Sequence, residues 1–250
     1  IQKPLTMKHL KTIFSVLALV AAFSCTKSHT EGNGQVTFKV SNNQVVADMT
    51  KSNVSDYTTL PSAGDFTITI LDASSTVVWT GKISEWNPAA TTLLAGNYTV
   101  NASYGDLEVE GFDKPYFTGT QTFAVKGAEK VAVSIPVALG NTIVKLSFSD
   151  YFKKYYSDYS FKFTRGGAEI ATVSKDETRA VFVDGYKINL EGTLTGETKT
   201  YTFEKEYTML NEATAYTINF DVPEVGGSTI TISFNNNVEE VDLGEFELNE

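Results

Sequence analysis

Cysteine and histidine are nearly missing from this chain, and their scarcity excludes several kinds of chemistry. The 250 residues include one cysteine, Cys25, and two histidines, His9 and His29. A single cysteine forms no internal disulfide, so the fold must depend on its apolar core. From residue 30 onward the sequence offers no Cys–His or Ser–His–Asp nucleophile system and no ordinary zinc site. We predict no metal and no cofactor.

Positive charge is also in short supply. The chain has 20 basic and 30 acidic residues and a net charge of −10. Lys3, Lys8 and Lys11 precede Cys25, so the chain from Cys25 onward has 17 basic and 30 acidic residues, a net charge of −13. A surface of this sign repels phosphate backbones, and we therefore expect no binding to nucleic acid.

Residues 1–24 are typical of a leader with a signal peptide. Two lysines follow the first methionine, and an apolar run occupies residues 13–23. This run is shorter than the roughly 20 residues that a membrane-spanning helix needs. The tetrapeptide Ala22-Phe23-Ser24-Cys25 resembles a bacterial lipobox, although Phe23 is larger than the usual residue there. We predict cleavage before Cys25 and attachment to the membrane through a lipid on its sulfur.

The remainder divides into a tether and a β-rich body. Residues 25–33 hold the lipidated cysteine and a polar segment without periodicity. Beyond it, polar and apolar residues alternate in short runs such as Phe66–Ile70 and Ile230–Phe234. Such alternation is typical of antiparallel sheets with one buried and one exposed face. We predict an all-β fold of two tandem antiparallel β-sandwich domains, residues 34–139 and 140–250, with very little helix.

A repeated pattern supports two similar domains. Each half has a predicted hairpin, then an apolar pair, a glycine turn, a tyrosine and an alternating strand. The last four features lie in Leu93–Val100 of the first half and Val181–Ile188 of the second. The repeat predicts a duplicated sandwich with its joint near Leu139-Gly140-Asn141.

Two short helices are predicted within this β pattern. Residues 82–86 allow at most one turn. In residues 150–158, aromatic residues at spacings of three and four form one face of a helix, and Ser149 or Asp150 is placed to cap its start.

Several segments carry a resemblance to a known family. They are Ala95–Gly105, Phe112–Gly119, Phe148–Tyr159 and Ser174–Ala180. Together with the lipobox they resemble an uncharacterised-function domain family of Bacteroidales cell-envelope lipoproteins, related to the fimbrillin-like proteins. The resemblance implies transthyretin-like or immunoglobulin-like sandwiches. It also implies an outer-membrane lipoprotein at the cell surface, and the sequence does not decide in which leaflet the lipid is held. It also implies an adhesion, accessory or tip component with pilus subunits as partners, and it transfers no active site.

The resemblance also bears on assembly. Many fimbrillins are matured by an arginine-specific protease that removes an N-terminal strand, and a neighbour's strand then fills the groove. This chain has only Arg165 and Arg179, and none lies between Cys25 and Thr164. Cleavage at arginine therefore cannot release the first predicted strand, whereas cleavage after Lys51 could. We predict a closed monomer that does not polymerise on arginine-specific digestion.

Aromatic residues give the best candidate ligand contacts. These are Tyr151, Tyr155, Tyr156, Tyr159 and Trp86. Tyrosine rings stack on sugars, but the four tyrosines also suit a short helix that closes one end of a sandwich. Trp86 follows Glu85 in a polar stretch, so we expect its ring to be exposed.

Three functions remain open at this point. The leading one is a non-enzymatic surface lipoprotein of fimbrillin-like type. The alternatives are a glycan-binding lipoprotein of a polysaccharide uptake system and a glycosidase that uses only carboxylates. The acids of residues 106–113 partly imitate a calcium loop, but Phe117 stands where a bidentate glutamate is required. We interpret them as the outward side chains of a strand end.

Overall fold

The computed structural model describes residues 32–42, 53–222, 229–234 and 237–242. The predicted signal peptide, Cys25 and Lys51 lie outside these ranges. Within them the chain is mostly β-strand, as predicted. The first eight strands are β1 (Asn33–Asn42), β2 (Thr67–Asp72), β3 (Val77–Lys82), β4 (Thr92–Leu94), β5 (Gly96–Tyr104), β6 (Gly111–Phe112), β7 (Phe117–Val125) and β8 (Lys130–Leu139).

The second half continues in the same style. Its strands are β9 (Thr142–Phe148), β10 (Asp158–Arg165), β11 (Ala168–Ser174), β12 (Val181–Val183), β13 (Tyr186–Thr195), β14 (Thr200–Leu210), β15 (Ala215–Asp221), β16 (Thr229–Phe234) and β17 (Asn237–Asp242). Helix is confined to α1 (Ile83–Trp86), α2 (Asp150–Tyr155) and two 3₁₀ turns, η1 (Val54–Asp56) and η2 (Ala63–Asp65). None of these described helices is long and apolar enough to cross a bilayer.

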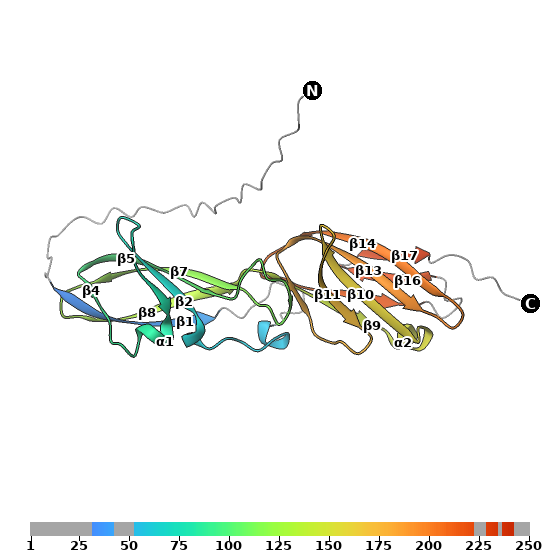
Figure 1. Cartoon of the computed structure of the whole chain (residues 1–250), viewed down its shortest axis with the longest axis horizontal. Helices are drawn as coiled ribbons and strands as arrows, with labels where there is room; N and C mark the ends of the chain where they lie inside the picture. The colour runs from blue at the N-terminus through green and yellow to red at the C-terminus, as the bar shows by residue number, and fades with distance from the viewer. Residues whose placement is uncertain (1–31, 43–52, 223–228, 235–236, 243–250) are drawn as a thin grey trace, which may run out of the picture.

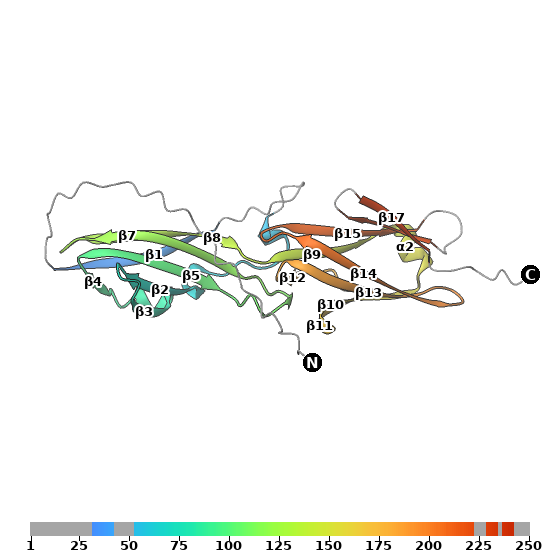
Figure 2. The ribbon, with the colours of Figure 1, turned by 90° about the horizontal axis from the view of Figure 1, so that it is seen from above.

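The same strand order occurs twice along the molecule (Figures 1 and 2). In the first half the order β3-β2-β5-β7-β8-β1-β4 forms one sheet that is continuous through the β7–β8 pair. In the second half β11-β10-β13-β14 forms one sheet, and β15-β9-β12 lies within a six-stranded second sheet. Even the irregularities match, because the hairpin register shifts between Ile70 and Leu71 in one copy and between Phe163 and Thr164 in the other. The duplication that the repeated hairpin pattern predicts is therefore present in the topology.

One strand pair in each sandwich departs from the predicted antiparallel arrangement. β1 runs parallel to β8, and β9 runs parallel to β15. A parallel pair needs a long connection between its strands. In both copies the first strand of the sandwich pairs with a strand near the end of the same sandwich. The strands between them form the long connection that a parallel pair needs.

The two copies differ at one sheet edge. In the second sandwich the β16–β17 hairpin continues the sheet beyond β15. The equivalent strand of the first sandwich, β8, pairs on that side only through Leu139 and Ala138, which meet the start of β7. Among the described residues, no strand covers the rest of that edge, residues 130–137.

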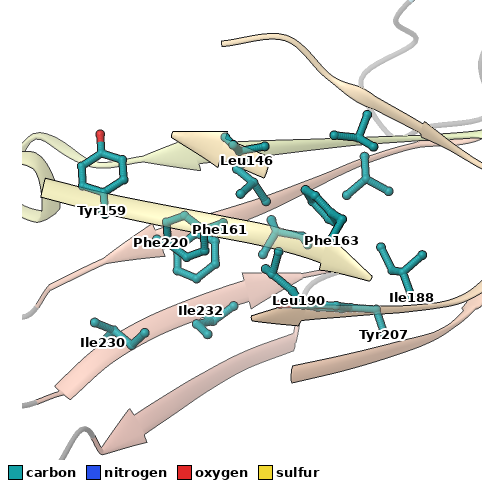
Figure 3. Packing of buried hydrophobic residues seen from close by; sticks show 14 of the residues in the cluster. Leu146, Tyr159, Phe161, Phe163, Ile188, Leu190, Tyr207, Phe220, Ile230 and Ile232 are labelled. Carbon is teal, nitrogen blue, oxygen red and sulfur yellow. The ribbon is translucent and has the colours of Figure 1, made fainter. Parts of the chain in front are cut away.

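Buried side chains form two clusters, one in each sandwich. Figure 3 shows the second, in which Phe161 lies 4.6 Å from Phe220 between ring centroids. The cluster of the first sandwich also contains four residues from the second half of the chain. These are Ile143, Ala180, Phe182 and Ala215. The apolar interior therefore continues through the joint between the sandwiches.

The joint itself is buried and hydrogen-bonded. β8 ends at Leu139 and β9 begins at Thr142. Between them, the side chain of Asn141 is 2% exposed and donates to the Lys114 carbonyl at 2.8 Å. Its amide oxygen accepts from the Tyr116 N–H at 3.3 Å. These bonds join the start of the second sandwich to a loop of the first.

Candidate contact surfaces

Helix α2 begins where the sequence predicts. The Ser149 hydroxyl oxygen accepts a hydrogen bond from the Phe152 N–H at 3.0 Å and so caps the first turn. Lys153 and Lys154 lie in the last turn, where positive charge stabilises the helix dipole. The helix packs its Phe152 ring into the core at the end of the second sandwich.

Tyr156 and Tyr159 belong to that core. Their rings lie 4.9 Å and 5.2 Å from the ring of Phe152, and both side chains are buried. Burial raises the pKa of Tyr156 far above its ordinary value. Figure 3 shows Tyr159 among the other core side chains. As candidate ligand contacts these two residues are therefore excluded, and the interpretation as a helix that closes the sandwich holds for them.

Tyr151 and Tyr155 remain at the surface of α2. The Tyr151 side chain is 53% exposed. Tyr155 is partly buried and packs edge-on against Tyr156, with ring centroids 5.1 Å apart. Two of the four predicted tyrosines can therefore meet a partner, at the end of the second sandwich.

The prediction that the Trp86 ring is exposed is wrong. Trp86 is only 2% exposed, and its indole N–H donates a hydrogen bond to the Val36 carbonyl at 2.8 Å. The ring packs edge-on against Phe38 and Trp79. Although its neighbours in sequence are polar, Ile83 and Trp86 are three residues apart and share the inward face of α1. That spacing is the signal that identifies this tryptophan as core.

The acidic segment 106–113 lies in a loop of the first sandwich, between β5 and β7, which contacts the second sandwich; it is not a strand end. Val109 would point inward if the acids were the outward side chains of a strand end, but it is 45% exposed. Gly111 and Phe112 form β6, which pairs with Phe182 and Val181 of β12. No group of three or more histidine, cysteine, aspartate or glutamate residues within the described ranges is placed to hold a metal ion.

Glu110 fixes this loop of the first sandwich to the second sandwich. Its carboxylate accepts two hydrogen bonds from the Arg165 guanidinium, at 2.7 Å and 3.1 Å. It also accepts from the Asp184 N–H at 2.7 Å. A bidentate arginine–carboxylate pair is among the strongest polar contacts in proteins, and its planar geometry fixes orientation. The side chain of Glu110 is mostly buried, so this pair is better shielded than an ordinary surface ion pair.

A second arginine makes a parallel set of contacts. Arg179 binds Asp113 at 3.0 Å and Glu177 at 2.6 Å, and its guanidinium lies 4.5 Å from the Phe112 ring centre. The hydrogen bond from Arg179 lowers the pKa of Glu177 to about 2. The sequence did not predict these contacts. Glu110 and Asp113 are far in sequence from the arginines that they bind, and only Glu177 is close to its partner.

Comparison with solved structures gives several distant matches in fold. A fimbrial assembly protein from Parabacteroides distasonis has 6% identity and a TM-score of 0.48, over 85% of this chain and 98% of that one. A candidate cell adhesion protein from Bacteroides ovatus has 13% identity and a TM-score of 0.46, over 87% and 99%. A candidate polysaccharide-binding protein from Bacteroides thetaiotaomicron has 13% identity and a TM-score of 0.42, over 85% and 99%.

These identities and scores are too low to transfer a function or a site to this chain. None of the curated proteins matches it. The match to a family model is stronger evidence, because it spans residues 32–246 and so includes both sandwiches and the joint between them. The chain belongs to the family described as a domain of unknown function, DUF4493.

Proposed function

We propose that the protein is a non-enzymatic cell-envelope lipoprotein, a fimbrillin-like adhesion or accessory component held at the outer membrane by Cys25. The observation that carries this proposal is the arrangement of the chain along its long axis. β1 starts at the pole of the first sandwich that faces away from the second, and α2 lies toward the opposite pole (Figure 1). A lipid on Cys25 would hold one pole at the membrane and present the other.

A strand from a pilus subunit is the partner that suits the first sandwich. Among the described strands, none pairs with the edge of β8 at residues 130–137, and an added strand could pair there. In the second sandwich the equivalent edge of β15 carries β16, so this fold accepts a strand there. This edge supports an accessory or tip subunit that takes one donor strand.

The anchor has a direct test. The mature protein should begin at Cys25 and partition with membranes, and Cys25→Ala should leave it unprocessed or soluble. The acyl chains would supply the membrane affinity, at about 0.8 kcal/mol per buried CH₂. Intact-mass analysis of membrane-derived protein measures the modification, and an unmodified Cys25 in that fraction would refute lipidation.

Assembly gives a second test, by digestion with arginine-specific and lysine-specific proteases in parallel. We expect no polymers after the arginine-specific enzyme, since both arginines follow Thr164 and each is held in ion pairs. Light scattering measures the particle size. Fibres after arginine-specific digestion would instead indicate a main shaft subunit. Growth only with the lysine-specific enzyme would place the switch at a lysine, with Lys51 as the first candidate.

A glycan-binding lipoprotein is the second candidate function. The exposed ring of Tyr151 and the partly buried ring of Tyr155 favour it, because aromatic rings stack on sugars. Replacing Tyr151 by alanine should then weaken glycan binding and leave cell adhesion through protein partners unchanged. The glycosidase has no such support among the described residues, where Glu110 of the acidic segment is engaged with Arg165.

A further inference from the structure

The turn that leads into β13 holds an exposed aromatic ring on a strained backbone. Tyr186 has a φ of 73°, and the Lys187 N–H donates to the Gly185 carbonyl at 3.0 Å. Together these features describe a classic γ-turn, which is rare and strained for a residue with a side chain. The Tyr186 side chain is 71% exposed, the largest exposure among the large hydrophobic residues of the described chain.

The first sandwich does not have this strain at the equivalent position. Phe163 pairs with Leu190 next to the hairpin irregularity of the second sandwich, and Ile70 pairs with Val100 at the same point of the first. Four residues before Leu190 is Tyr186, and four residues before Val100 is Gly96. These two residues therefore occupy equivalent positions in the two sandwiches. Gly96 does not have a positive φ, so the backbone strain at Tyr186 is not a general requirement of this fold.

Both sandwiches hold this turn in place. The Arg165 guanidinium donates to the carbonyls of Asp184 and Gly185, and Glu110 of the first sandwich accepts from the Asp184 N–H. Ligand sites are frequent at such junctions between domains. Within the described part of the chain, no side chain donates to the Asp184 carboxylate, and the Tyr186 ring stacks on no other ring. A carboxylate and an aromatic face therefore lie two residues apart on a rigid support.

We propose that Tyr186 and Asp184 form a contact site for a pyranose ring of a neutral glycan. A sugar presents C–H groups to an aromatic face and hydroxyl groups to nearby acceptors, which suits one ring beside a carboxylate. A protein partner would need a broad patch with an apolar centre, whereas the residue after Tyr186 is a lysine paired with Glu206. The inference goes beyond the proposed function, because this site is distinct from α2 and does not require a lipid on Cys25.

Native gel electrophoresis through galactomannan or mixed-linkage β-glucan tests this site. We expect at least one polymer to retard the purified protein, and Tyr186→Ala to weaken that retardation about fivefold to tenfold, the loss of one stacking contact. Tyr186→Phe keeps the ring and should retain binding. Leu94→Ala removes another highly exposed apolar side chain, so it is the matched control and should bind normally. No retardation of the unmodified protein by either polymer, or equal retardation of Tyr186→Ala, would overturn the proposal.

A folding control separates loss of the contact from loss of structure. Tyr186→Gly relieves the strain at positive φ, so it should melt at a temperature at least as high as the unmodified protein while losing glycan binding. A lower melting temperature for this variant would show that the side chain serves the fold, and would count against the site.

Discussion

Replacing Trp86 with alanine should lower the free energy of unfolding by about 3–5 kcal/mol, as expected for a large buried aromatic residue. The side chain fills space between Phe38 and Trp79, and its indole N–H satisfies the Val36 carbonyl. The substitution therefore leaves both a cavity and an unpaired backbone acceptor. Urea unfolding followed by circular dichroism measures the change.

Trp86→Phe is the matched control. It keeps an aromatic ring but removes the donor to Val36, so its cost should be clearly smaller than that of alanine. Tyr151→Ala, at an exposed position of α2, should change stability by less than about 0.5 kcal/mol. A Trp86→Ala protein as stable as the Tyr151→Ala protein would show that Trp86 is not part of the core.

Neither half of the chain should fold alone, although the sequence predicts two tandem sandwich domains. Residues 32–140 would lose four side chains of their own core cluster, and residues 141–250 would lose β6 from the edge of β12. Glu110 and Arg165 would each lose the partner of a mostly buried ion pair, which is strongly destabilising. We expect each separate half to lack a cooperative thermal transition and the intact chain to show a single one.

Differential scanning calorimetry of the halves and the intact chain makes this comparison. An equimolar mixture of the halves should recover part of the transition, because their contacts are complementary. A half that melts sharply without the other would contradict the prediction, and would show that the shared core at the joint contributes little to stability.

Local patterns explain why much of the fold could be predicted from the sequence. Alternation identifies strands because successive side chains point to opposite faces. Ser149 is recognised as a cap because its hydroxyl acts only three residues along the chain. The repeated hairpin is visible because the strands, and even the irregularity of register, recur in the same order.

The features that escaped prediction depend on residues far apart in sequence. Glu110 and Arg165 are separated by 55 positions, and no local pattern indicates that they meet. β6 has only two residues and pairs with a strand of the other sandwich. Tyr156 and Tyr159 are buried, whereas Tyr151 is exposed and Tyr155 is partly buried. The difference arises because α2 ends at Tyr155 and the residues after it turn inward.

The parallel pairing of β1 with β8 determines how the first sandwich responds to tension. If a lipid holds the chain at Cys25 as we propose, a pull from the membrane would enter at the start of β1 and leave through the end of β8 toward the second sandwich. Because these strands run in the same direction over eight residue pairs, from Gln35 with Lys130 to Asn42 with Val137, the load slides one strand along the other. All the hydrogen bonds between them then share the force in shear, instead of opening one after another from an end. With the proposed anchor at Cys25, this arrangement would withstand drag along the long axis of the molecule.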